Sequence, residues 1–96
     1  MTILTVQKIK PQIVPLLKQA GVSRSAIFGS FAKGNESKES DIDILIEFQG
    51  EKTLLDLVAL KTELEKVLNR KVDLLTYKSL SLLLRNKILR ESIPIL

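Results

Sequence analysis

Three aspartates stand at or near the start of two short apolar segments of this 96-residue chain. Asp41 and Asp43 are two residues apart at the start of segment 43–48, and Asp73 interrupts segment 72–77. Side chains two residues apart in an extended segment point to the same face, so Asp41 and Asp43 should lie together. Carboxylates that meet at one point repel one another unless a cation joins them. The spacing therefore indicates a site for divalent metal ions.

The chain contains no cysteine and no histidine. This composition excludes disulfides, zinc sites built on Cys or His, and catalytic Ser-His or Cys-His pairs. A metal would sit on oxygen ligands, which favours a hard cation such as Mg²⁺. Two such ions, about 4 Å apart, can hold the attacking and leaving oxygens of an in-line phosphoryl substitution.

The elements that would position these residues follow from hydrophobic periodicity. Helical spacing predicts helices over 5–20 and 53–68, the second capped by Thr53 and ended at Asn69. Pro11 and Pro15 imply a kink or a late start of the first helix, with Pro11 as its possible first residue. Strands are expected at 25–28, 43–48 and 72–77, and a last helix should run from Ser79 or Ser81 to about 91, stopped by Pro94.

These elements predict an α/β (α+β) fold in one domain, residues 1–96, with the order α-β-α-β-α-β-α. We expect a three-stranded mixed sheet packed with about four helices. Strands 43–48 and 72–77 flank a helix and should be parallel through a right-handed crossover. Strands 25–28 and 43–48 should be antiparallel neighbours. That topology brings all three aspartates to one edge of the sheet.

A small-residue turn should meet the aspartates at this edge. Glycine lets a backbone approach a phosphate closely, so Gly29 and Ser30 could bind a triphosphate, and Lys33 with Gly34 could complete the cradle. Taken singly, each feature has a plainer explanation. An Asp-x-Asp is often a capped turn, a strand-start aspartate is often solvated, and a lone lysine usually lies on the surface.

Together, the motifs Phe28–Gly34, Ser40–Ile46 and Val72–Leu75 resemble the nucleotidyltransferase superfamily that includes DNA polymerase beta. The pattern is G-S-x-A-x-G, a loop, S-D-hydrophobic-D and a later Asp on a strand. The chain is most similar to minimal nucleotidyltransferases, which often serve as antitoxins of HEPN-domain toxins. Many relatives have Arg where this chain has Phe31 or Lys33, and lysine lacks the bidentate fork of arginine.

The resemblance implies roles for particular residues. Asp41 and Asp43 would bind the metal ions, two Mg²⁺, that hold the triphosphate of an NTP, most simply ATP. Asp73 would bind the catalytic metal and help to activate an acceptor hydroxyl. The implied nucleotide-binding residues are Gly29, Ser30, Lys33, Gly34 and Ser40.

Three functions are compatible with these residues. The first is transfer of AMP to a hydroxyl of a HEPN toxin, which would make the chain a catalytic antitoxin. The second is a non-catalytic antitoxin that neutralises its partner by occlusion, suggested by Leu82, Leu83, Leu84, Ile88 and Leu89, although core packing is the simpler expectation for any one of them. The third, nucleotidylation of a small molecule such as an aminoglycoside, would need substrate-binding structure that 96 residues do not supply.

Net charge, aromatic content and apolar segments limit which kinds of partner the chain could bind. The net charge of +4 fits phosphate-rich ligands or an acidic partner, but three Phe and one Tyr do not make a stacking surface for nucleic acid. No segment approaches the roughly 20 apolar residues of a membrane span, and the first residues do not resemble a signal peptide. A cytoplasmic location is expected.

Overall fold

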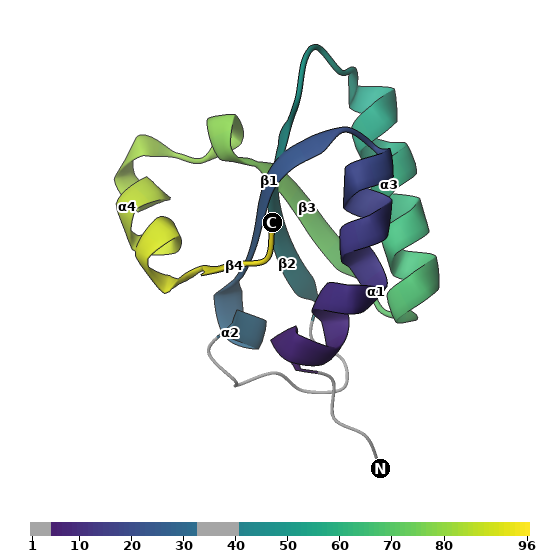
Figure 1. The fold of residues 1–96 in the computed structure, drawn as a ribbon. Helices are drawn as coiled ribbons and strands as arrows, with labels where there is room; N and C mark the ends of the chain where they lie inside the picture. The colour runs from purple at the N-terminus through teal and green to yellow at the C-terminus, as the bar shows by residue number, and fades with distance from the viewer. Residues whose placement is uncertain (1–4, 33–40) are drawn as a thin grey trace.

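The computed structural model describes residues 5–32 and 41–96 (Figure 1). Four strands form one sheet in the order β3-β2-β1-β4: β1 (Val22–Phe28), β2 (Ile42–Phe48), β3 (Val72–Thr76) and β4 (Ile93–Pro94). Helices α1 (Val6–Gln19) and α3 (Leu54–Leu68) lie together on one side of the sheet, and α4 (Leu82–Glu91) lies on the other (Figure 1). The remaining turns are α2 (Gly29–Ala32) and the 3₁₀ turn η1 (Tyr77–Ser79).

The predicted strand directions are confirmed. β1 pairs antiparallel with β2, and β2 pairs parallel with β3. The connection from β2 to β3 runs through α3, as a parallel pair requires. These pairings fix which residues of the three strands lie side by side, so they decide the geometry of the aspartate edge.

The predicted numbers of strands and helices were both wrong. The fourth strand, β4, pairs with β1 through Ile27 opposite Ile93 and Ala26 opposite Pro94. It is only two residues long and contains a proline, which is compatible with an edge strand but looks like a helix stop in the sequence. In residues 5–32 and 41–96, three helices exceed one turn, with 14, 15 and 10 residues, whereas α2 is a single turn of four residues.

Helix α1 does not begin at Pro11. It runs from Val6 to Gln19, and Thr5 caps it by accepting a hydrogen bond from the Lys8 N–H. Pro11 and Pro15 lie inside the helix and are both exposed. Each proline removes one backbone donor from the helix, and its exposed position keeps the ring out of the core. The buried side, Ile9, Ile13 and Leu17, is therefore continuous through both prolines.

Helix α3 confirms its predicted boundaries. Thr53 accepts a hydrogen bond from the Asp56 N–H, and the Asp56 carboxylate accepts one from the Thr53 N–H, which completes a capping box. Asn69 ends the helix in the left-handed conformation, with φ of 53°. No helix among the described residues is long and apolar enough to cross a membrane.

The two faces of the sheet are covered to different extents. The face under α1 and α3 carries the main core. On the other face a smaller cluster forms around Leu45, beneath Leu80 and part of α4, and it contains Phe28 and Tyr77. Helix α4 buries no residue fully, and only Ile88 and Leu89 pack against this cluster. The main core contains Ile9, Ile13, Leu17, Val22, Ile27, Ile42, Ile44, Ile46, Leu60, Leu64, Leu68, Val72, Leu74 and Ile95.

Candidate active site

The aspartates of β2 and β3 are direct neighbours across the sheet. In the parallel pairing Asp43 lies opposite Asp73, and in the antiparallel pairing it lies opposite Phe28, the last residue of β1. Residues opposite one another share a face, so Asp43 and Asp73 project from the same side. It is the side opposite the main core, because Ile42, Ile44, Val72 and Leu74 belong to that core. The sequence prediction that topology joins these aspartates is confirmed.

Gly29 is fitted closely against Asp43. It follows β1 directly and has φ of 73°, a conformation that L side chains rarely adopt. A Cβ atom built on Gly29 would overlap the Asp43 carboxylate at Oδ2. The sequence predicts that Gly29 lets the backbone approach a phosphate. In the structure its lack of a side chain also leaves room for the Asp43 carboxylate.

The electrostatics of Asp43 reflect this crowding. Its pKa is raised from 3.8 to about 6, chiefly because burial disfavours the charged form, and further because the negative charges of Asp73 and Asp41 repel it. Asp56 is a contrasting case. Hydrogen bonds from the Thr53 backbone and hydroxyl lower the pKa of Asp56, because they stabilise its ionised form. A cation bound beside Asp43 would stabilise the ionised form of this carboxylate, which burial and the two neighbouring charges disfavour.

The carboxylates fit a hard divalent cation in donor type and charge. Asp41 is exposed just before β2, Asp73 is exposed in β3, and Asp43 is half-buried between their charges. Their oxygens are the ligands that Mg²⁺ prefers. No three acidic side chains in residues 5–32 and 41–96 are already drawn together as a ligand set. The aspartates form an open cluster, with Asp43 at its centre.

The predicted phosphate-binding residues are described only in part. Gly29 and Ser30 belong to α2, which packs against β2 and so lies beside the aspartates. Lys33, Gly34 and Ser40 lie outside the described residues. The structure therefore describes only the Gly29 and Ser30 part of the predicted phosphate-binding site, in which the Gly29 backbone lies close to the Asp43 carboxylate.

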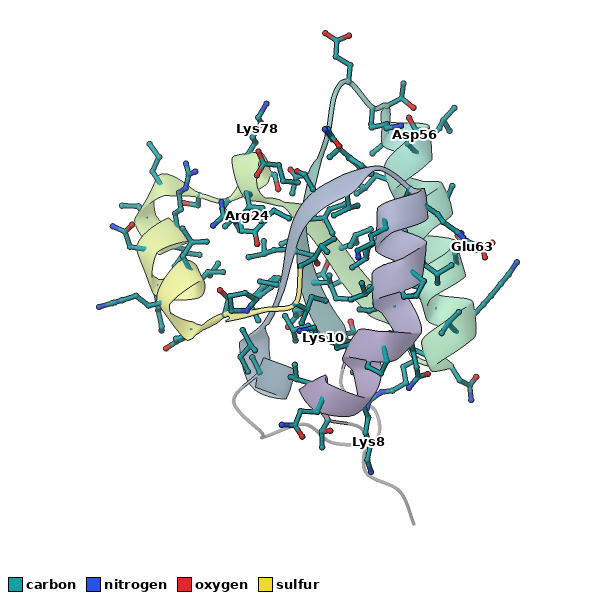
Figure 2. All side chains as sticks on the ribbon, in the orientation of Figure 1. Lys8, Lys10, Arg24, Asp56, Glu63 and Lys78 are labelled. Atoms are coloured by element: carbon teal, nitrogen blue, oxygen red, sulfur yellow. The ribbon has the colours of Figure 1, made fainter. Side chains whose placement is uncertain are left out.

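A second polar feature lies at the far end of the same face, and no sequence motif predicted it. The Arg24 guanidinium lies over the Tyr77 ring, 4.1 Å from its centroid. Figure 2 labels Arg24 on β1 and Lys78 on η1 nearby. A cavity of about 430 Å³ opens there, lined by Glu47, Tyr77 and Lys78 among others. It includes none of the three aspartates, so we treat it as separate from the carboxylate site.

Sequence comparison identifies the family. The model of the family described as "Polymerase beta, Nucleotidyltransferase" matches residues 11–96. The chain belongs to this family. It is a nucleotidyltransferase.

Two named relatives of this nucleotidyltransferase are protein adenylyltransferases. A Methanocaldococcus jannaschii protein that carries this name provisionally is 50% identical over 93 residues, which cover 97% of this chain and 100% of the relative. The Thermococcus cleftensis protein adenylyltransferase MntA is 33% identical over 95 residues, with 95% and 96% coverage.

Solved structures share the nucleotidyltransferase fold. A provisionally named minimal nucleotidyltransferase superposes with a TM-score of 0.84 and 33% identity, covering 98% of this chain and 99% of that chain. The MNT antitoxin complex with the tri-AMPylated HEPN toxin of Shewanella oneidensis gives a TM-score of 0.73 and 22% identity, with 94% and 71% coverage. At that identity the second likeness shows the fold alone.

Proposed function

We propose that this nucleotidyltransferase moves AMP from ATP to a hydroxyl group of a HEPN-domain protein and thereby acts as its antitoxin. The observation that carries the proposal is the placement of Asp43 opposite Asp73 on an open face, with Gly29 against Asp43. The names of the adenylyltransferase relatives support AMP as the transferred group. The toxin–antitoxin complex with the same fold supports the class of acceptor.

The reaction is an in-line substitution at the α-phosphorus of ATP. The acceptor oxygen forms a bond to this phosphorus, the bond to the β-phosphate oxygen breaks, and pyrophosphate leaves. Asp41 and Asp43 would hold Mg²⁺, which would neutralise the negative charge of the triphosphate when bound. Asp73, which is exposed beside Asp43, orients the acceptor hydroxyl and its carboxylate takes up the proton.

Label transfer tests the catalytic proposal. The chain is incubated with α-³²P-labelled ATP, Mg²⁺ and a HEPN-domain protein from the same organism. We expect label on the HEPN protein with wild-type chain and none with Asp41→Ala/Asp43→Ala. Label that persists in the double variant, or no label with wild type, contradicts the proposal. Omitting Mg²⁺ and adding EDTA tests the metal requirement in the same assay.

Neutralisation by occlusion is a second candidate, and it is favoured by one observation. Leu82, Leu83 and Leu84 are exposed in the first turn of α4, where a partner could cover them. Asp41→Asn/Asp43→Asn/Asp73→Asn separates the two functions. If this variant still protects cells from the HEPN protein, occlusion is sufficient. If protection is lost while the variant still binds the HEPN protein, neutralisation depends on the active-site carboxylates.

A further inference from the structure

The beginning of α4 exposes three consecutive leucines. The exposed fractions of Leu82, Leu83 and Leu84 are 84%, 93% and 54%. The helix is attached to the molecule near its other end, where Ile88 and Leu89 pack on the smaller core. Its first turn is thus not required to complete either core. Adjacent apolar side chains of this size are typical of a surface that another molecule covers.

The same part of the chain is also basic. Segment 77–92 contains four basic residues, Lys78, Arg85, Lys87 and Arg90, against one acidic residue, Glu91. Its net charge is therefore +3, out of +4 for the whole chain. All four basic side chains are exposed, and Figure 2 shows Lys78 extending outward from η1. The occupant of this surface should be acidic as well as apolar.

The position of α4 connects this surface to the active site. Helix α4 contacts β1 and α2, and α2 carries Gly29, which is fitted against Asp43. In Figure 1 the end of α4, not its leucine-rich beginning, lies toward α2, so a protein that covers α4 along its whole length would reach the edge of the sheet where the aspartates lie. We propose that Leu82, Leu83 and the surrounding basic residues form the docking surface for the acceptor protein, through an acidic helix with an apolar stripe. This inference rests on the proposed function for the identity of the acceptor.

Other occupants fit less well. A second copy of the chain would bring two segments of charge +3 together, which is unfavourable. A nucleic acid would match the charge but not the leucines, and Tyr77, the one aromatic residue in this segment, is buried and cannot stack on bases. An anionic membrane remains as an outcome for the experiment to separate, because leucines beside basic residues can also bind lipid.

The chain offers a closely matched control. Helix α3 also begins with two exposed leucines directly after a capping hydroxyl residue. Leu54 and Leu55 follow Thr53 and are 73% and 79% exposed, whereas Leu82 and Leu83 follow Ser81. In Figure 1, α3 begins on the side of the sheet opposite α4. Two double variants can therefore be compared, Leu82→Ser/Leu83→Ser and Leu54→Ser/Leu55→Ser. Each removes two exposed leucine side chains from the first two positions of a helix, one pair in α4 and the other in α3.

The experiment measures binding and transfer separately. Calorimetry with the HEPN-domain protein used in the transfer assay gives Kd, and label transfer gives KM for that protein. For Leu82→Ser/Leu83→Ser we expect at least about a tenfold rise in Kd and in KM, with kcat and the KM for ATP unchanged. Leu54→Ser/Leu55→Ser should match wild type. Arg85→Glu should weaken binding at low salt, whereas Lys61→Glu on α3 should not.

Several results would overturn the inference. These are an unchanged Kd for the α4 variant, a loss confined to the α3 variant, or no binding of the HEPN protein by wild type. An α4 variant that loses dimerisation, binding to phosphatidylglycerol vesicles or binding to RNA, while it keeps HEPN binding, also overturns it. If wild type binds through α4 but transfers no label, the catalytic proposal fails and the docking surface stands.

Discussion

The two faces of the sheet are built from alternate residues of the same strands, yet they differ where strands β2 and β3 begin. On the face under α1 and α3, Ile42, Ile44 and Ile46 of β2 are completely buried. On the opposite face, Asp43 and Asp73 remain open at the strand starts. A strand presents successive side chains to opposite sides, so residues adjacent in sequence can serve stability and chemistry independently. We therefore expect substitutions at adjacent positions of one strand to differ in effect. One should lower the rate of AMP transfer, and the other should lower the free energy of unfolding.

Loss of Asp73 should have the largest effect, and it should fall on activity. Asp73→Asn removes one carboxylate from an exposed position, so the packing of the sheet is unaffected. Asp73 is proposed to take up the proton of the acceptor hydroxyl, and general-base catalysis of this kind contributes about 10²–10⁴-fold, so the rate of AMP transfer should fall about 10³-fold. Single-turnover label transfer measures the rate, and urea unfolding should show nearly wild-type stability. A variant that retained rate but lost stability would break the division between the faces.

Substitution of Ile44 should have the opposite pattern. Ile44 follows Asp43 directly, but it is fully buried in the main core. Ile44→Ala leaves a cavity and should lower the free energy of unfolding by about 3 kcal/mol. Equilibrium urea denaturation measures this change. Under conditions where the variant remains folded, its rate of AMP transfer should stay within a few-fold of wild type.

Much of this division was predictable from the sequence. The shared face of Asp41 and Asp43, the Thr53 cap and the crossover through α3 follow from local patterns. The crossover places Asp43 beside Asp73. The prediction succeeded because each step depends on periodicity or on a connection rule. The strand directions alone predicted that Asp43 and Asp73, which are 30 positions apart in the sequence, lie side by side.

The features that were missed depend on tertiary context. β4 is held by pairing with β1 and by burial of Ile95, and neither is visible in a two-residue segment containing a proline. The course of α1 through Pro11 and Pro15 depends on both prolines facing solvent. The close approach of Gly29 to the Asp43 carboxylate could be predicted only from the register of β1 and β2, which the sequence does not show.

Gly29→Ala should disturb the aspartate face with a smaller effect than Asp73→Asn. The positive φ of Gly29 makes alanine unfavourable by about 1 kcal/mol, and its Cβ would displace the Asp43 carboxylate. Gly50 provides the control, because its φ of +82° is similar to the +73° of Gly29 and nothing lies within 4 Å of its Cβ position. Both alanine variants should lose similar backbone stability in urea denaturation. The rate of label transfer should fall in Gly29→Ala alone, and equal rates would show that the contact with Asp43 is dispensable.

The smallest predicted effect is the pH dependence that Asp43 gives to stability in EDTA. Because its pKa rises from 3.8 to about 6 on folding, between these values the folded chain holds a proton that the unfolded chain has lost. The free energy of unfolding should therefore fall as the pH rises through this range. The full shift corresponds to about 3 kcal/mol, which solvent screening reduces to roughly 1 kcal/mol.

Difference curves between wild type and single variants isolate this contribution from that of other carboxylates. Urea unfolding of wild type and Asp43→Asn, measured from pH 4 to 7 in EDTA, should show the variant gaining relative stability as the pH rises. Asp56→Asn should lose relative stability from pH 3 to 5, because Asp56 has a lowered pKa and its contribution disappears as the pH falls. Adding Mg²⁺ at pH 7 should stabilise wild type more than Asp43→Asn. An equal response of the two proteins to Mg²⁺ would remove Asp43 from the metal site and leave its raised pKa as a consequence of packing alone.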